Sequence, residues 1–451
     1  MRLIAWFSLA CAAACSSSTP RADAGPAART DAATRDGSSQ SDRDAGNPGA
    51  VRDAGDAGAA RDAGDAGPTR DAGDAGAIRD AGDGVMPAWV PAPGTFADIS
   101  LNSMADVDPC PAGGCAYSEV TGQESVFSVW NGGAFAPDYS AYGALLCHGG
   151  GHAGYSGNEV YAFDLSTRMW ERLGTPSPYA ESQADNNGEY PDGNPFPPHT
   201  YQSQGFLSSA NGGGAKGSFL RFGFAGASVK QWAHRFDLAT STWSRFADLS
   251  SVPTNQSYFG ACFDPTRNVH WILGGGDSSG GIGKLSADGT LAIVGKGDNV
   301  DGQHVLGYCP RHDMLVNFGT ASGQPHIAGW LCTASATTYF ATLKVSGDGP
   351  GTGYNGGLEW STLLGCFVTY PGNGSTTVYK LTPPAEDPLV DTWVWSSETL
   401  TGANGAAPIT ANYPSGYNGH WSRFREVPAL KSFVYADGRR NPVQLWRLTG
   451  M

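Results

Sequence analysis

The segment 143–173 limits the possible folds more than any other part of this chain, because short apolar runs alternate in it with glycine and polar turns. An apolar run at 144–146 is soon followed by three glycines at 149–151. A second run at 159–165 alternates its side chains with a period of two, and after a Ser-Thr turn a last run carries Trp170. Short period-two runs bounded by glycine and polar turns predict the strands of an antiparallel sheet.

The order of these parts resembles a kelch repeat, the blade unit of galactose-oxidase-type β-propellers. The apolar strand, the glycine run, Tyr161, the Asp-Leu-Ser-Thr turn and Trp170 follow one another at kelch spacing. A second unit repeats the Phe-Asp-Leu-x-Thr turn and then carries Trp243, and four more degenerate units follow. The resemblance implies an all-β, kelch-type β-propeller with six blades. The long stretches at 174–198 and 402–416 leave seven blades open.

The last unit stops after its third strand, so the ring of blades needs one more outer strand. The segment 94–101 has the pattern of such a strand. We therefore expect the propeller to be closed by an N-terminal strand of the domain, as propellers often are. Closure removes the exposed sheet edge that otherwise invites aggregation.

Composition divides the chain into three parts. Residues 1–15 form an apolar leader, and residues 16–90 are nearly all Ala, Asp, Gly, Arg, Ser, Thr and Pro. A nonapeptide of the form RDAGDAGxx recurs from residue 43, and it is too polar and too rich in glycine to bury a core, so we interpret 16–90 as a disordered tether. Calcium-binding β-rolls also use Gly-Asp nonapeptides, but they need a larger apolar residue than alanine in each repeat. The remainder, 91–451, is long enough for one large β-propeller domain.

The leader predicts export. It carries one arginine, a short apolar run and small residues before a cysteine, and the run is too short to span a membrane. It resembles a bacterial lipoprotein signal, with the sequence Ala-Ala-Ala before Cys15 matching the lipobox better than the competing site at Cys11. The resemblance implies lipidation of Cys15 and anchoring to a bacterial membrane, at the outer membrane or the cell surface. The alternative is an ordinary secretory signal that is cleaved nearby.

Two bulk properties limit the partners and the disulfides. The formal net charge of -14 argues against nucleic acid, because phosphates require clustered Lys and Arg. After export, Cys110 and Cys115 are close enough in the sequence to form a small disulfide loop. Five cysteines remain, an odd number that cannot all pair: Cys147, Cys262, Cys309, Cys332 and Cys366. Of these, Cys262, Cys309 and Cys366 are expected at the same place in successive repeats, as small core side chains.

The repeat also predicts where a ligand would bind. In a four-stranded blade, the segment that enters the innermost strand and the loop between the second and third strands open on the same face. Aromatic, imidazole and amide side chains gathered at a concave mouth are typical of ligand sites. The candidate ligand-binding residues in these segments are His148, His152, Tyr155, Asn158, His199, Tyr201, Tyr258, His304, Asn355, His420, Trp421 and Arg423.

Several of these candidate residues also have a purely structural interpretation. Tyr201 and Tyr258 can equally be packing aromatics, and His148 and His152 can cap the glycine turn. Arg221 lies in the apolar run FLRFGF, so it needs either a buried partner or a ligand anion. The remaining four histidines, in strands or outer turns, are interpreted as structural: His234, His270, His312 and His326.

An acidic insertion precedes the second blade. Asp185, Glu189 and Asp192 provide the oxygen ligands that calcium prefers, and calcium is the one cofactor that the sequence suggests. Their spacing matches no known calcium loop. The alternative is a solvated lid over the channel mouth.

Three functions remain open. The first is a binding module on the cell surface that holds a polysaccharide or a surface protein at the channel mouth. The second is a lyase that cuts uronate-containing polysaccharide by β-elimination, which requires a base, an acid and a cation against the carboxylate. Its candidate catalytic residues are His199, Tyr201, Tyr258, His304 and Arg423, with Arg221 as an alternative cation. The third is a copper-radical oxidase like galactose oxidase, for which no ligand set can be assigned here.

Overall fold

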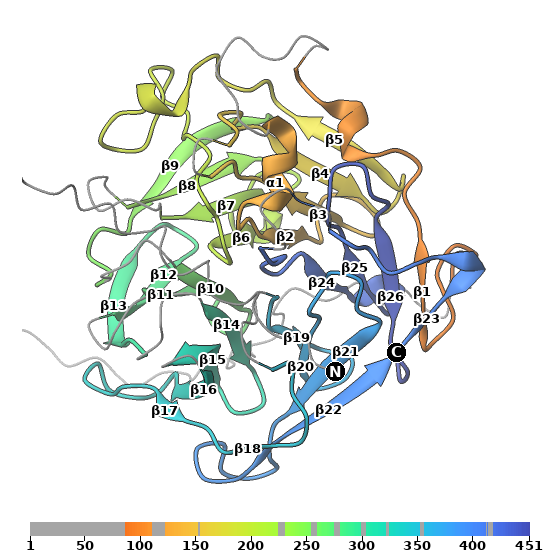
Figure 1. The fold of residues 1–451 in the computed structure, drawn as a ribbon. Helices are drawn as coiled ribbons and strands as arrows, with labels where there is room; N and C mark the ends of the chain where they lie inside the picture. The colour runs from red at the N-terminus through yellow and green to blue at the C-terminus, as the bar shows by residue number, and fades with distance from the viewer. Residues whose placement is uncertain are drawn as a thin grey trace, which may run out of the picture. The chain divides into compact units, whose positions relative to one another are not determined.

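Short antiparallel strands dominate the structure, a computed structural model that describes residues 86–110, 122–151, 154–223, 231–253, 259–274, 280–298, 304–321, 324–351, 356–411, 413 and 418–451. These residues form six small sheets, which are numbered here in chain order (Figure 1). The prediction of an all-β propeller with six blades is confirmed. The predicted leader, Cys15 and nearly all of the predicted tether lie outside the described residues.

The first four sheets each contain four strands, which follow one another from the innermost to the outermost. Sheet 1 contains β2 (Gly133–Ala136), β3 (Ala144–Cys147), β4 (Val160–Asp164) and β5 (Met169–Leu173). Sheet 2 contains β6 (Gln204–Leu207), β7 (Ser218–Phe222), β8 (Trp232–Asp237) and β9 (Thr242–Asp248). Sheet 3 contains β10 (Phe259–Asp264), β11 (Val269–Gly274), β12 (Gly281–Ser286) and β13 (Leu291–Lys296). Sheet 4 contains β14 (His304–Cys309), β15 (Met314–Ala321), β16 (Gln324–Leu331) and β17 (Ala341–Thr342).

The last two sheets have five strands each, because a short parallel strand is added at the outer edge. Sheet 5 contains β19 (Glu359–Ser361), β20 (Cys366–Thr369), β21 (Thr377–Thr382), β22 (Trp393–Thr399) and β18 (Val345–Ser346). Sheet 6 contains β24 (Phe424–Val427), β25 (Ser432–Tyr435), β26 (Gln444–Arg447), β1 (Thr95–Asp98) and β23 (Thr401–Gly402).

Helical structure in the described ranges is confined to short turns. The one α-helix is α1 (Ser125–Ser128), and the 3₁₀ turns are η1 (Met104–Val107), η2 (Gly122–Glu124), η3 (Glu181–Gln183), η4 (Ser209–Asn211), η5 (Ala403–Gly405) and η6 (Pro428–Leu430). None of these helices has the length and apolar character that crossing a bilayer requires.

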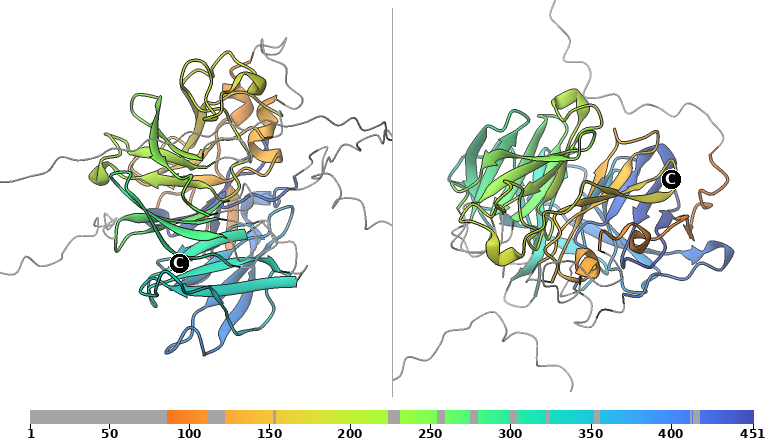
Figure 2. Two further views of the ribbon diagram at one scale, coloured as in Figure 1. Left: turned by 90° about the vertical axis from the view of Figure 1, so that its left-hand side faces the viewer. Right: turned by 90° about the horizontal axis from the view of Figure 1, so that it is seen from above.

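The innermost strands close a ring. Contacts run from β2 to β6, β10, β14, β19 and β24 in turn, and from β24 back to β2. Figure 1 shows these strands around the centre of the ring, and Figure 2 shows the sheets from two further directions. Consequently each sheet packs between two others.

The strand β1 forms part of the sheet that holds the last strands of the chain. It pairs antiparallel with β26, from Thr95 opposite Arg447 to Asp98 opposite Gln444, and parallel with β23 on its other side. Figure 1 shows β1 between these two C-terminal strands. The ring Phe96 stacks on Trp446, with centroids 4.2 Å apart and planes inclined by 12°.

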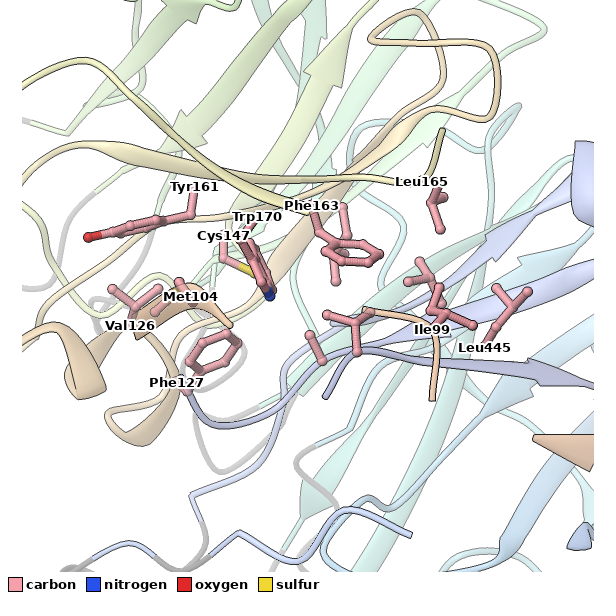
Figure 3. Packing of buried hydrophobic residues seen from close by; sticks show 14 of the residues in the cluster. Ile99, Met104, Val126, Phe127, Cys147, Tyr161, Phe163, Leu165, Trp170 and Leu445 are labelled. Atoms are coloured by element: carbon pink, nitrogen blue, oxygen red, sulfur yellow. The ribbon is translucent and has the colours of Figure 1, made fainter. Parts of the chain in front are cut away.

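The core lies between neighbouring sheets, so both faces of each sheet are buried. On β4, all five residues are buried: Tyr161 and Phe163 pack in a cluster with residues of sheet 6, whereas Val160 and Ala162 pack in a cluster with residues of sheet 2. Figure 3 shows the first of these clusters, in which Trp170 and Leu445 pack with apolar side chains of α1 and η1. Aromatic residues at alternating positions therefore serve the contacts between blades.

The cysteines depart in one respect from the expected register. Cys262 and Cys309 lie on the innermost strands β10 and β14, but Cys366 begins β20, the second strand of its sheet. The innermost strand of sheet 5 has only three residues, Glu359–Ser361, and this short run is easily missed in the sequence. The five cysteines outside the predicted disulfide loop are free thiols. Cys110 is disulfide-bonded, while Cys115 lies outside the described residues.

We expect Phe96→Ala to lower the free energy of unfolding by about 3–5 kcal/mol, because it removes a fully buried ring from the strand β1. The matched control is Leu101→Ala, a side chain that is 62% exposed just after the same strand, with an expected change within about 0.5 kcal/mol. Equilibrium unfolding in guanidinium chloride measures both values. Equal effects of the two substitutions would show that β1 contributes little to the stability of the ring.

Candidate functional site

The segments that enter the innermost strands meet at one end of the ring. The amide of Tyr201, before β6, donates to the carbonyl of Trp130, before β2, at 2.7 Å. The amide of Ser422, before β24, donates at 3.0 Å to the carbonyl of Gly356, before β19. The predicted convergence of entry segments therefore holds for sheets 1 and 2 and for sheets 5 and 6. Three of the predicted ligand-binding residues lie outside the described residues: His152, Tyr258 and Asn355.

Four rings form a continuous aromatic row on these entry segments: Trp130, His199, Tyr201 and Trp421. The centroids of Trp130 and His199 are 5.2 Å apart with planes inclined by 19°, and those of His199 and Tyr201 are 5.6 Å apart and inclined by 29°. Tyr201 meets Trp421 edge to face at 4.9 Å. Trp130 is half-buried, whereas the other three rings are buried. Trp130 is therefore the one partly exposed ring of the row, and it packs against the buried rings.

Three members of the aromatic row share an unusual backbone conformation. Trp130 has φ of 53°, Tyr201 of 42° and Trp421 of 44°, and each lies three residues before an innermost strand. Large side chains rarely adopt this left-handed conformation, which costs free energy and is found disproportionately at functional sites. The sequence interpretation missed Trp130. The signal that identifies it is its position before β2, which matches that of Tyr201 before β6.

Close backbone approach explains why a glycine follows Trp130. A Cβ on Gly132 would lie 2.1 Å from the carbonyl oxygen of Tyr201 and 2.3 Å from that of Trp421. Only glycine fits where three entry segments touch. The amide of Gly132 also donates a hydrogen bond to the Thr200 hydroxyl of the neighbouring segment at 3.0 Å. The aromatic row is therefore held by backbone contacts and not only by ring packing.

Arg423, expected to face a ligand, is instead buried and ties the segments together. Its Nη2 donates to Asp437 at 2.7 Å, its Nε donates to the carbonyl of Ala436 at 3.1 Å, and its Nη1 donates to the carbonyl of Asn131. Both the arginine and the aspartate side chains are 0% exposed. All three nitrogens of the guanidinium are thus engaged within the protein, and its charge is matched by a buried carboxylate.

Two predicted histidines are buried and neutral. His420 donates from Nε2 to the carbonyl of Tyr370 at 2.6 Å, and His148 donates from Nδ1 to the carbonyl of Glu159 at 3.0 Å. Burial lowers the pKa of each imidazole to about 3, because the charged form loses its hydration. Neither ring is a general base that water reaches in this conformation.

The other described candidates hold loops in place. Asn158 donates to the Ser177 hydroxyl and to the carbonyl of Pro195, both at 2.9 Å, and so attaches the insertion to sheet 1. Tyr155 donates to the carboxylate of Glu159 at 2.5 Å. His304 begins β14 and is buried.

The acidic residues of the insertion face different partners. Asp185 and Asp192 accept hydrogen bonds from their own turns, at Asn187 and Asn194 respectively. Glu189 accepts two bonds of 2.6 Å from Arg245 and one of 3.0 Å from His234, and these partners hold its pKa down at about 2, against the opposing effect of burial. Within the described part of the chain, no group of three His, Cys, Asp or Glu residues could hold a metal ion.

Two polar features near the same end of the ring were not predicted. Gln202 donates to the carbonyl of Leu306 at 2.9 Å and accepts from the amide of Leu306, so its side chain joins the entry segment of sheet 2 to the innermost strand of sheet 4. Asp298 contacts His326 Nε2 at 3.1 Å and accepts from Asn317 at 2.8 Å. His326 had been interpreted as structural; its carboxylate partner could not be recognised from the sequence, because the two are 28 residues apart.

The chain matches no protein-family model and no curated protein. Solved structures with a similar course of the chain include a structural genomics protein of unknown function from Bacteroides thetaiotaomicron, with a TM-score of 0.42, 11% identity, and coverage of 78% of this chain and 75% of that chain. Kuenenia stuttgartiensis hydrazine synthase gives a TM-score of 0.38, 10% identity, and coverage of 71% and 84%. A chain of a nidogen/laminin complex gives 0.35, 10%, 59% and 85%. Likenesses this distant transfer no activity, ligand or partner to this chain.

We expect stability to fall as the pH is lowered below about 6.5, the pKa of an unfolded histidine. The folded pKa values of His148 and His420 are depressed to about 3, so between these limits the unfolded chain binds more protons than the folded chain. Each histidine then costs about 1.4 kcal/mol per pH unit. Urea unfolding between pH 7 and pH 4.5 measures this slope. His420→Asn, which keeps a donor for the Tyr370 carbonyl, is expected to reduce it, and an unchanged slope would contradict the assignment.

Proposed function

We propose that this protein is an extracytoplasmic β-propeller that binds a glycan, without catalysis, at the aromatic row. The observation that carries the proposal is the half-buried Trp130 in a left-handed backbone conformation, stacked on His199 and supported by Tyr201. Backbone strain at a large aromatic residue persists only where the surroundings enforce it, and here it recurs at three equivalent positions.

The chemistry of the row suits a sugar. An indole ring offers a broad apolar face for the C–H side of a pyranose and a polar edge for its hydroxyls. Rings that are already packed lose little conformational freedom on binding, which favours affinity. The bond from Gly132 to Thr200 and the bond from Arg423 to the carbonyl of Asn131 hold the supporting segments together, as a preformed site requires. A protein ligand at the same surface is the alternative occupant.

The position of the domain in the cell forms part of the proposal. Lipidation at Cys15 would attach the chain to a bacterial membrane, and the polar stretch 16–90 would act as a flexible spacer between the anchor and the propeller. Display at the outer membrane or cell surface suits capture of a polysaccharide from outside the cell.

The polysaccharide lyase is the second candidate, and the surroundings of its two arginines make it weaker. Elimination next to a uronate carboxylate needs a cation that neutralises this group. The guanidinium of Arg423 is engaged with Asp437 and with backbone carbonyls, and Arg221 is only 1% exposed, so neither cation faces a polymer at the surface. The copper-radical oxidase stays a hypothesis from the sequence alone.

Trp130→Ala is the direct test of the glycan site. We expect a glycan array to identify ligands of the purified chain, and calorimetric titration with the best of them to show a Kd raised about tenfold or more by the substitution. Tyr339→Ala is the matched control, because this ring is 52% exposed in the segment after β16 and lies outside the aromatic row. Glycan affinity that is equal in wild type and Trp130→Ala would refute binding at the row.

A separate assay tests the lyase. The chain is mixed with a panel of uronate polysaccharides, with and without calcium, and the ultraviolet absorbance of unsaturated product is followed. The binding proposal predicts a flat trace. Growing absorbance that is lost in His304→Ala or Tyr258→Phe would replace the binding proposal with the lyase.

A further inference from the structure

Sheet 2 carries a row of polar side chains across all four of its strands. Gln204 on β6 lies opposite Arg221 on β7, Arg221 lies opposite His234 on β8, and His234 lies opposite Arg245 on β9. The neighbouring residue Phe219, on the same face of β7 as Arg221, packs with residues of sheet 1. This polar row therefore runs between two sheets that otherwise meet through apolar contacts.

Arg221 is a buried cation without a carboxylate of its own. It is 1% exposed, and it donates to the carbonyl of Phe196 at 3.0 Å and to His234 Nδ1 at 2.7 Å. His234 then donates from Nε2 to Glu189 at 3.0 Å, so the imidazole separates the two charges. Burial lowers the pKa of Arg221 to about 9, which leaves it charged at neutral pH.

Arg221 has no carboxylate bonded directly to it among the described residues. Glu189 is the one carboxylate whose charge acts on Arg221 in the described part of the chain, and it is already shared with Arg245 through two bonds. Two guanidinium groups thus share one carboxylate: the partly exposed Arg245 bonds to it directly, whereas the buried Arg221 meets it only through His234.

Three buried polar atoms beside Arg221 lack hydrogen-bond partners among the described residues: Arg221 Nε, Gln204 Oε1 and His148 Nε2. Gln204 is the cross-strand neighbour of Arg221 and donates to the carbonyl of His148 at 2.9 Å, and the charge of Arg221 acts on the His148 ring. The three side chains are therefore neighbours. Each orphaned atom costs free energy unless a bound molecule satisfies it.

The donors and acceptors define the ligand that fits. Arg221 Nε is a donor and requires an acceptor. His148 Nδ1 holds the ring proton for the Glu159 carbonyl, so the neutral ring offers Nε2 as an acceptor. The Oε1 atom of Gln204 is also an acceptor, because its Nε2 faces the His148 carbonyl. A water molecule could bond to all three atoms, but it would leave Arg221 without a directly bonded anion.

We propose that a small hydroxylated carboxylate binds at Arg221, between sheets 1 and 2. Its carboxylate accepts from Arg221 Nε and gives Arg221 a directly bonded anion, and its hydroxyl donates to Gln204 Oε1 or His148 Nε2. The insertion covers this site, since Phe196 bonds to Arg221 and the carbonyls of Pro197 and Pro198 accept from Gly151 and Gly150. The site is separate from the aromatic row and does not depend on the proposed glycan binding.

Three probes separate charge from hydroxyl in the test. The full chain is titrated with sodium glycolate, sodium acetate and neutral glycolamide at constant pH and ionic strength, and calorimetric titration and thermal unfolding are followed. We expect glycolate to bind about tenfold more tightly than acetate, which lacks one hydrogen bond, and to exceed glycolamide by at least as much. Absence of glycolate binding to the wild-type chain, or equal effects of all three probes, would overturn the proposal and leave water as the occupant.

Substitutions at Arg221 and at a control position test whether glycolate binds at Arg221. Arg221→Gln is expected to abolish glycolate binding, and Arg221→Lys, which keeps the charge but lacks Nε, is expected to weaken it at least tenfold and serves if Arg221→Gln fails to fold. Arg235→Gln is the matched control, because Arg235 follows His234 on β8 and so faces the opposite side of the same sheet. An unchanged glycolate Kd in a folded Arg221 variant, or the same loss in Arg235→Gln, would refute binding at Arg221.

Discussion

The close approach of the entry segments at the end of the ring is the constraint on which the rest of the structure depends. At Gly132 the carbonyls of two other segments come so near that no side chain fits. This approach brings the innermost strands together, and the sheets must then fan outward with both faces buried against their neighbours. It also forces Trp130, Tyr201 and Trp421 into left-handed conformations that isolated peptides avoid.

This packing buries polar groups away from water, and most of them form hydrogen bonds with other groups of the protein. Arg423 bonds to Asp437 and to carbonyls of neighbouring segments, so one buried ion pair satisfies groups from sheets 1 and 6 together. The same demand is met only in part around Arg221, where the nearest carboxylate is reached through His234. Arg423 has hydrogen-bond partners for all three of its nitrogens, whereas Arg221 lacks one for Nε among the described residues, and for this reason we assign only Arg221 to a ligand.

Much of the fold could be predicted, and much less of the site. Alternation around Tyr161 and Phe163, the glycine runs and the Asp-Leu turns are local signals, so they indicated the strands and the six units directly. For the candidate site, the sequence indicated which segments lie at one end of the blades, but it did not distinguish exposed from buried side chains. Arg423 and His420 resemble ligand-binding residues in the sequence, yet both are buried and bonded within the ring.

By itself, the sequence determined the class of fold and indicated the segments that converge, because these follow from residue patterns within a few positions of one another. It left six or seven blades open, and the described residues form six sheets. The tertiary structure alone decided which polar side chains form hydrogen bonds within the ring and are therefore not free to bind a ligand. The guanidinium of Arg423 meets the carbonyl of Asn131 across 292 positions of the chain, and Gln202 meets Leu306 across 104. A side chain's availability for a ligand depends on such distant partners, since burial and hydrogen bonding are set by whatever the closed ring brings beside it.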